Sequence, residues 1–376
     1  MTTLVNPIIL SARFEKTFGV QPRIFKAPGR INIIGEHVDY CGGMVMPAVI
    51  DRACYVAAAP NDLGVLRVYS DFGNADIELN HFTQMGDWRD YVAGMAFALI
   101  EAGEVITGHD LIMQSDVPVG AGVSSSAALE VSVGLALTGG RVSGPRLAKI
   151  AQRAENNFVG MSCGIMDQFA SANGVADHAL LLDCASLDFQ TLHVPSNACF
   201  LLVDSGIKHE HVGGDYASCR ADCETAASTL KVKLLCEIDS VAALSPLEGS
   251  VLKRARHVVS EIARTKAACA ALIDGDLIEL GALMNQSHMS LSTDMEVSTP
   301  EVDRLADIAQ ATAGVYGARM MGGGFGGSII ALVNPVQAAS AQGVISSSYA
   351  HYLGRQPDSF IVKLARGAHE IEGFSL

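Results

Sequence analysis

The chain has 376 residues, of which 49% are hydrophobic and 18% charged, and its formal net charge at pH 7 is −14. This composition predicts a globular protein with at least one large core, and the length suggests two domains. The net negative charge argues against general binding of nucleic acid or anionic lipid, because both need clustered Lys and Arg. Nine cysteines without a Cys-x-x-Cys pair, in a chain without a secretory signal, favour a cytoplasmic protein with reduced thiols and no zinc site.

Short runs rich in Val and Ile alternate along the chain with longer segments of helical periodicity, which predicts a mixed α and β protein. In chain order, strands are expected at Met44–Ile50, Cys54–Ala59, Val65–Ser70, Leu111–Val117, Ala179–Leu182, Phe200–Val203, Ile329–Val333 and Phe360–Leu364. Helices are expected at Pro145–Gly160, Ile165–Ala172, Tyr216–Lys231, Val251–Leu272 and Thr299–Thr312. The longest charge-free stretch, residues 320–354, is broken by glycines, serines and Pro335, so a soluble protein without a membrane span is expected.

A polar stretch from Leu187 to Ser196, which contains a proline, separates two apolar strands and predicts a domain boundary. We therefore expect an N-terminal domain of residues 1–190 and a C-terminal domain of residues 191–376. A monomer is expected.

The segment from Pro118 to Ala128 reads Pro-Val-Gly-Ala-Gly-Val-Ser-Ser-Ser-Ala-Ala and lies between an apolar run and a helical pattern. It therefore predicts a strand, a tight loop and a helix start, where unpaired N–H groups and the helix dipole attract phosphate. The segment lacks the Gly-Lys-Ser/Thr ending of a Walker A loop and the third glycine of a dinucleotide fingerprint. The candidate ligands of a nucleotide phosphate are Gly120, Gly122, Ser124, Ser125 and Ser126.

This segment resembles the central ATP-binding motif of the GHMP small-molecule kinases. Residues 29–40 resemble the galactokinase signature, residues 322–328 the C-terminal glycine motif, and residues 163–169 the galactokinase segment that carries the catalytic aspartate. The resemblance spans nearly the whole chain, from Phe25 to Leu364. It implies an α+β, two-domain GHMP kinase fold, with an N-terminal half like the second domain of ribosomal protein S5 and a ferredoxin-like C-terminal half.

The resemblance implies an ATP-dependent kinase that phosphorylates D-galactose at its anomeric hydroxyl, the first committed step of the Leloir pathway. Asp167 is then expected against the anomeric hydroxyl, which it orients and whose proton it takes late. Arg30 is expected close to both Asp167 and the transferring phosphoryl group, where it offsets charge in a loose transition state. The expected partners are galactose and MgATP.

Metal and nucleotide contacts follow from the same resemblance. Ser126 and Glu155 match the family's Mg²⁺ ligands, and a hydroxyl, a carboxylate and phosphate oxygens suit this ion. From the residues alone, Glu155 is better interpreted as a solvated surface glutamate. Trp88 and Tyr91 correspond to positions near the adenine, although a lone Trp is more often core packing.

Sugar selectivity is expected from side chains that bond individual hydroxyls. Glu36 and His37 match the family's contacts to the C6 hydroxyl, and Asp39 matches the contacts to C3 and C4. Gly164 and Tyr216 complete the expected pocket. A glutamate at position 36 favours a neutral 6-hydroxyl over a uronic acid, whose carboxylate would meet a like charge.

Two other functions remain open. Val38, Cys41 and Met321 depart from the galactokinase pattern, as do Ser292, Thr293 and Met295, so a related arabinokinase or galacturonokinase is an alternative. Some galactokinase-like proteins are sensors that bind galactose and ATP without turnover, and in these the serine-alanine part of the central motif is incomplete. Here residues 124–128 are intact, which favours catalysis.

Overall fold

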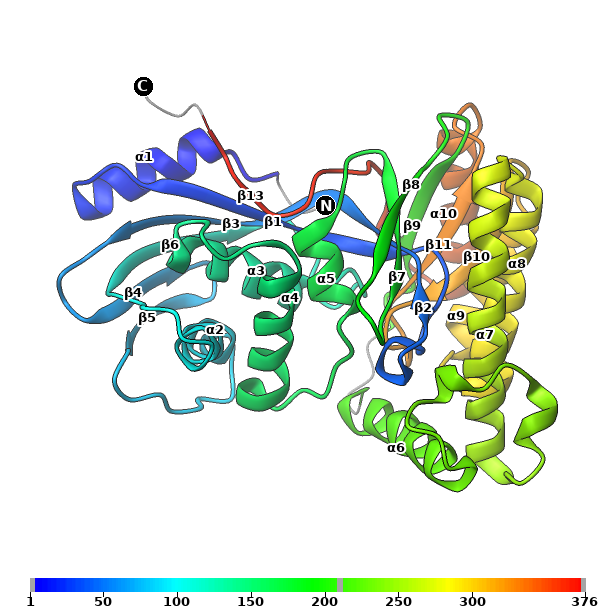
Figure 1. Cartoon of the computed structure of the whole chain (residues 1–376). Coiled ribbons are helices and arrows are strands. Elements are labelled where there is room, and N and C mark those ends of the chain that lie inside the picture. The colour runs from blue at the N-terminus through cyan, green and yellow to red at the C-terminus, as the bar shows by residue number, and fades with distance from the viewer. Residues whose placement is uncertain (1–3, 208–211, 373–376) are drawn as a thin grey trace.

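The computed structural model describes residues 4–207 and 212–372. They form two β-sheet layers with helices packed against them, joined by a small third sheet (Figure 1). Among the described residues, no helix is long and apolar enough to cross a membrane. The expected α+β class with a two-part organisation is confirmed.

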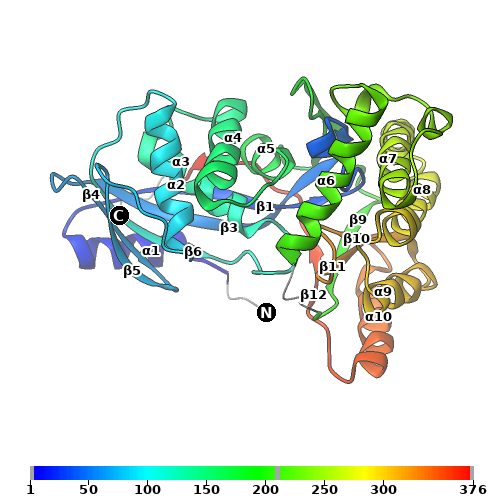
Figure 2. The ribbon, with the colours of Figure 1, turned by 90° about the horizontal axis from the view of Figure 1, so that it is seen from below.

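The first sheet has six strands in the order β13-β1-β3-β6-β4-β5. Helices α2, α3, α4 and α5 lie on one face and α1 on the other (Figures 1 and 2). The strands are β1 (Arg23–Asn32), β3 (Pro47–Pro60), β4 (Val65–Ser70), β5 (Gly73–Glu78), β6 (His109–Ser115) and β13 (His369–Glu370). The helices are α1 (Pro7–Phe18), α2 (Arg89–Glu101), α3 (Ser125–Thr138), α4 (Gly144–Arg153) and α5 (Met166–Asn173).

Strand β3 shows why this sheet is covered on both faces. Alternate residues of a strand point to opposite sides, and here both sets are apolar. Tyr55 and Ala57 belong to the small core that includes Phe14 of α1, whereas Cys54 and Val56 belong to the main core beneath the other helices. Burial of both faces explains why one continuous strand forms.

The second sheet has four strands in the order β10-β11-β9-β12. Strand β10 packs against α8 and α9, and α7 packs on α8. The strands are β9 (Cys199–Asp204), β10 (Val315–Met321), β11 (Ser328–Val333) and β12 (Ser359–Val362). The helices are α6 (Val212–Leu230), α7 (Gly249–Asp274), α8 (Leu277–Ser290), α9 (Pro300–Gln310) and α10 (Ala338–Leu353).

A three-stranded sheet, β2-β7-β8, lies where the two parts meet. Its strands are β2 (Met44–Val45), β7 (His178–Asp183) and β8 (Phe189–His193). Position 190 therefore falls within a strand, and the chain returns near its end to add β13 to the first sheet. A division at residues 190 and 191 stays a prediction.

Several expected elements differ from the observed ones. The two strands expected at residues 44–50 and 54–59 are wrong as separate units, because β3 runs without a break from Pro47 to Pro60, with a bulge in its pairing to β1 between Val49 and Ala53. The helix expected at residues 145–160 changes at Ala154 into a π-helical turn, η2 (Ala154–Val159), and ends at Gly160 in a left-handed conformation. Helices α1, α2, α8 and α10 and strands β1, β5, β8, β10 and β13 were not expected.

Candidate active site

The serine-rich segment forms the predicted strand, loop and helix start. Strand β6 ends at Ser115 and α3 begins at Ser125, with Gly120, Gly122 and Ser124 in left-handed conformations between them. The second glycine-rich segment lies directly against this loop: a Cβ atom added at Gly122 would be 3.0 Å from the Met321 carbonyl oxygen. Two segments about 200 positions apart in the chain therefore form one backbone-rich wall.

Arg30 and Asp167 form an ion pair beside this wall. Asp167 lies in the first turn of α5, and Arg30 follows an irregularity in the pairing of β1. The guanidinium donates to both carboxylate oxygens, with Nε–Oδ1 and Nη2–Oδ2 distances of 2.8 and 3.0 Å. Arg30 also donates to the Gly122 carbonyl, and the Ser124 hydroxyl donates to Asp167. The pair is thus bonded to the loop expected to bind phosphate.

A cavity of about 210 Å³ opens beside this ion pair. All the expected catalytic and sugar-contacting residues line it, and so does Glu155. Its lining consists of Arg30, Glu36, His37, Asp39, Glu155, Met161, Ser162, Cys163, Gly164, Met166, Asp167, Tyr216, Gly322 and Gly323. The structure therefore brings the first and last glycine-bearing regions, the Asp167 segment and α6 to one cavity, and the middle region is bonded to the ion pair in its wall.

Gly164 allows the cavity wall to close. A Cβ atom at this position would lie 1.8 Å from Oδ2 of Asp39, a separation that no side chain tolerates. We expect Gly164→Ala to weaken sugar binding by more than about tenfold and to lower the free energy of unfolding by about 1–3 kcal/mol, because Asp39 must move. Calorimetric titration with galactose and urea unfolding test this expectation.

Gly343 provides the matched control, because it lies in α10 and a Cβ atom there meets no atom within 4 Å. Gly343→Ala is expected to leave sugar binding unchanged and to stabilise the protein by about 0.5–1 kcal/mol. Unchanged sugar affinity in Gly164→Ala would contradict the proposed contact.

His37 is held as a neutral imidazole. Burial, followed by the charge of His257, lowers the pKa of His37 to about 3. Nε2 lies 3.2 Å from the Gly323 carbonyl oxygen, which only accepts hydrogen bonds, so we assign the ring proton to Nε2. Nδ1 then accepts from the Tyr40 hydroxyl at 3.0 Å. The ring therefore links the signature segment to the C-terminal glycine motif.

Asp39 occupies an unfavourable position for a charge when no sugar is bound. Burial, and then the negative charge of Asp167, raise the pKa of Asp39 to about 6. Its side chain accepts from the backbone N–H of Tyr40 at 2.9 Å and of Met166 at 3.5 Å. A raised pKa means that its stabilising contribution is present below about pH 4 and is lost as the pH rises through about 6.

Asp39→Asn is therefore expected to stabilise the sugar-free protein at pH 7.5 by about 1 kcal/mol, with the gain disappearing near pH 4. The gain is smaller than the full pKa shift implies, because the carboxylate faces the cavity, where water screens its charge. The same substitution is expected to weaken galactose binding. Denaturant unfolding at both pH values measures the gain, and a gain of equal size at pH 4 and 7.5 would contradict this interpretation.

The Mg²⁺ candidates lie together. Glu155 is 7% exposed in the π-helical turn η2, and its carboxylate interacts with the Ser126 hydroxyl. Burial, then the charge of Asp167, raise the pKa of Glu155 to about 7. Gln168 also donates to this carboxylate. The surface interpretation of Glu155 is wrong, because the residue lies one and two helical turns after the buried Ala151 and Ala148 and shares their face. The π turn that contains it is of a kind frequent at functional sites.

This donor set fits Mg²⁺. Within residues 4–207 and 212–372, no group of three or more His, Cys, Asp or Glu side chains could hold a metal ion. One hydroxyl and one buried carboxylate nevertheless suffice for an ion that keeps several waters and binds phosphate oxygens. A cation there would also offset the unfavourable negative charge of Glu155 beside Asp167.

The adenine-side candidates lie apart from the cavity, whose lining includes neither of them. Trp88 precedes α2 and packs, partly buried, against the main core. Burial, and then the negative charge of Glu155, raise the pKa of Tyr91 to about 12. A role of either residue in adenine binding stays a prediction.

Sequence reasoning missed two buried charges near the cavity. Arg319 on β10 is 0% exposed and pairs with Glu36, with an Nη2–Oε2 distance of 2.8 Å. Glu261 on α7 is also fully buried and accepts from the Gly35 N–H at 2.9 Å. An arginine in an otherwise apolar strand before the glycine motif was the available signal. Because Glu36 is paired, simple charge repulsion of a uronic acid is weaker than the sequence argument assumed.

Three family models match the chain. A galactokinase galactose-binding signature matches residues 12–60, a GHMP kinases N terminal domain matches residues 90–175, and a GHMP kinases C terminal domain matches residues 267–351. The galactokinase of Chloroflexus aurantiacus is 42% identical over 378 residues, covering 95% of this chain and 96% of the relative. A galactokinase of Glaesserella parasuis is 40% identical, covering 97% and 100%.

Solved structures agree. A Lactococcus lactis galactokinase complexed with galactose has a TM-score of 0.92 and 32% identity, covering 96% of this chain and 99% of that one. A Methanococcus jannaschii mevalonate kinase has a TM-score of 0.66 at 17% identity, covering 92% and 99%, and shares the fold. Fold and site together therefore define a GHMP kinase, a class whose cosubstrate is ATP. Within it, the chain belongs to the galactokinase family and is an ATP-dependent sugar kinase.

Proposed function

We propose that this protein transfers the γ-phosphoryl group of ATP to the anomeric hydroxyl of D-galactose, giving galactose 1-phosphate and ADP. The observation that carries the proposal is the ion pair of Arg30 and Asp167 in the wall of one cavity, where Ser124 of the phosphate-binding loop donates to Asp167. Membership of the galactokinase family and the likeness to a galactose-bound relative support galactose as the sugar.

Asp167 is the group we propose to manage the hydroxyl proton. Arg30 and Ser124 supply three donors to its oxygens, and a carboxylate offers about four lone-pair sites. One site therefore remains for the sugar hydroxyl. Asp167 orients this hydroxyl and accepts its proton as the new O–P bond forms, while the Arg30 guanidinium offsets the charge that develops on the phosphoryl oxygens.

The loop and helix start supply the phosphate contacts. Backbone N–H groups at the N-terminus of α3 offset phosphate charge, and the glycines at positions 120 and 122 allow close approach. Ser126 and Glu155 are the residues we propose to hold Mg²⁺, which supplies neutralisation of the triphosphate charge when bound.

Sugar hydroxyls are proposed to bond to Glu36 and Asp39, and to His37 when a hydroxyl replaces Tyr40 at Nδ1, with Gly164 and Tyr216 closing the pocket. The neutral His37, with its proton on Nε2, leaves the cavity without a histidine cation. We propose that the protein acts as a monomer in the cytoplasm on small-molecule substrates only.

The test is ADP release measured with ATP, Mg²⁺ and a panel of galactose, arabinose, galacturonate and glucose. Galactose is expected to give the highest kcat/KM. A preference for arabinose or galacturonate would favour the alternative sugar 1-kinases. Binding of ATP and galactose without ADP release would favour a sensor, although the intact helix start and the contact between Ser126 and Glu155 speak for turnover.

A further inference from the structure

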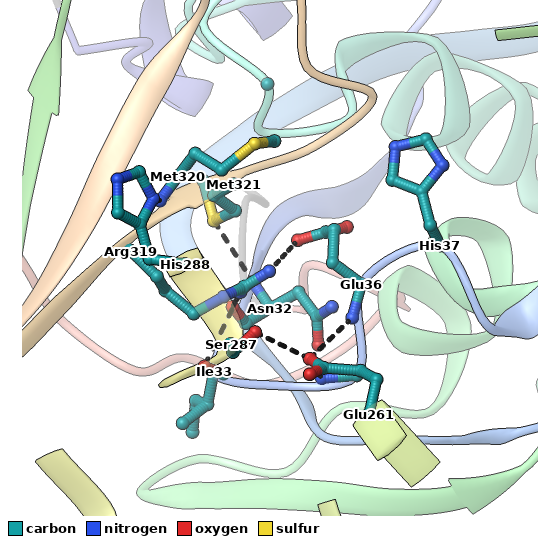
Figure 3. Close-up of polar contacts among 12 residues, drawn as sticks. Asn32, Ile33, Glu36, His37, Glu261, Ser287, His288, Arg319, Met320 and Met321 are labelled. Atoms are coloured by element: carbon teal, nitrogen blue, oxygen red, sulfur yellow. Dashed lines mark hydrogen bonds and ion pairs between the residues drawn. The ribbon is translucent and has the colours of Figure 1, made fainter. Parts of the chain in front are cut away.

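The signature segment that reaches the sugar cavity is attached to the second half of the molecule by buried charges. Arg319 donates to the Glu36 carboxylate, with an Nη2–Oε2 distance of 2.8 Å, and to the Asn32 carbonyl oxygen, with an Nη1–O distance of 2.7 Å. Figure 3 shows the guanidinium reaching from β10 to this segment. One planar cation therefore holds both a side chain and the backbone, which a lysine ammonium cannot do in the same geometry.

Glu261 holds the backbone of the same segment from the other side. Its Oε1 accepts from the Ser287 hydroxyl at 2.6 Å (Figure 3) and from the Gly35 N–H at 2.9 Å. Its Oε2 accepts from Arg264 Nε at 2.7 Å. Burial alone would raise the pKa of Glu261, but surrounding positive charges bring it to about 2. The backbone before Glu36 is thereby fixed, so the remaining freedom lies in the Glu36 side chain.

Glu36 lines the cavity, whereas Arg319 is not part of the lining and is completely buried behind it. A buried carboxylate needs a partner to stay ionised and in one position. The direction of the Glu36 carboxylate at the cavity wall is therefore set by a residue that the sugar does not touch.

We infer that Arg319 is a positioning residue that sets how the enzyme recognises the C6 end of its sugar, by holding the Glu36 carboxylate in place. This inference rests on the proposed galactokinase function and on the expected contact between Glu36 and the C6 hydroxyl. Loss of Arg319 should then reduce the advantage of a sugar with a 6-hydroxyl over one without it. The chemistry at C1, which is proposed to take place beside Asp167, should be affected much less.

The experiment compares D-galactose with 6-deoxy-D-galactose in steady-state kinetics. The wild-type protein is expected to prefer galactose in kcat/KM by at least about tenfold, since a buried acceptor left unpaired disfavours the deoxy sugar. Arg319→Lys is expected to raise the KM for galactose by about tenfold with kcat within about threefold. Its kinetics with 6-deoxygalactose are expected to change little, so that the preference largely disappears.

A second variant guards against misfolding. Glu36→Gln/Arg319→Gln removes both charges together and leaves no unpaired buried ion, so it is expected to fold. Its preference for galactose should equal that of Glu36→Gln alone, because Arg319 influences this preference through the Glu36 carboxylate. Arg67→Gln is the matched control: Arg67 pairs with Asp110 at 2.6 Å between β4 and β6, and its loss should leave the preference unchanged.

The outcomes are distinguishable. An equal loss of kcat/KM with both sugars in Arg319→Lys would show a merely structural role and overturn the inference. An additional loss of preference in the double variant beyond Glu36→Gln would also overturn it. Failure of the wild-type protein to release ADP with galactose would overturn the proposed function itself.

Discussion

Asp167→Asn is expected to lower kcat with galactose by about 10²- to 10⁴-fold, while binding of galactose and ATP is largely kept. The amide cannot accept the proton of the anomeric hydroxyl. Its NH₂ group would also face a donor, because Arg30 donates to one carboxylate oxygen and both Arg30 and Ser124 donate to the other. Single-turnover kinetics and calorimetric titrations with each substrate separate the chemical step from binding.

Asp188→Asn is the control, because this aspartate is exposed and lies outside the cavity lining. It is expected to keep wild-type kinetics. Near wild-type turnover in Asp167→Asn would show that Asp167 does not manage the hydroxyl proton, and the assignment of the catalytic centre would then be wrong.

Glu155→Gln is expected to reduce kcat by more than about 100-fold at physiological Mg²⁺, with partial recovery at high Mg²⁺. The same substitution is expected to stabilise the protein without ligands at pH 8 but not at pH 4. Burial and the Asp167 charge raise the pKa of Glu155 to about 7, so its contribution to stability is lost as the pH rises through that value. A glutamine carries no such charge, so the substitution is expected to lower kcat and yet to raise the stability at pH 8.

Two measurements check this prediction: Mg²⁺ dependence of ATP-analogue binding, and thermal unfolding at pH 8 and pH 4. Glu101→Gln, at the exposed end of α2, serves as the control and should change neither. Unaltered Mg²⁺ dependence in Glu155→Gln would remove Glu155 from the metal site, whatever happens to kcat.

The sequence predicted best those helices that begin with a proline or end at a glycine, because these residues favour particular backbone conformations. Pro145 falls in the first turn of α4, and Gly160 ends the following π turn with a φ angle of 85°. The same reasoning could have found α1, which begins after Asn6 with a proline and ends at Gly19 in a left-handed conformation. Such caps are local, so a sequence displays them directly.

Strand β1 could not be recognised in this way. Its sequence, Arg-Ile-Phe-Lys-Ala-Pro-Gly-Arg-Ile-Asn, contains cations, Pro and Gly that mask a strand pattern. Pairing with β3 and burial under α3 and α5 stabilise the strand regardless. This strand therefore forms because of tertiary contacts, which a local sequence pattern does not contain.

In the candidate site, too, local motifs indicated some residues, whereas the role of others depends on tertiary contacts. Family motifs led to Arg30, Asp167 and the glycine-rich segments, and the structure places Arg30, Asp167 and the C-terminal glycines in one cavity wall with the other glycine-rich loop bonded to the ion pair. The family motif led to Glu155, whereas the residues alone indicated a surface glutamate, because a charged side chain is seldom buried without a partner and its partners lie elsewhere in the sequence. Arg319 was missed because its importance depends on Glu36, a residue 283 positions away in sequence.

In the proposed complex, Asp167, Arg30 and the serine-lined helix start surround one sugar C1 oxygen. The most direct test is a crystal structure with D-galactose, Mg²⁺ and a non-hydrolysable ATP analogue. We expect the C1 oxygen within about 3.2 Å of an Asp167 carboxylate oxygen, and the terminal phosphate between Arg30 and the N-terminus of α3. A sugar bound with C1 directed away from Asp167, or phosphates bound away from that helix end, would contradict the account.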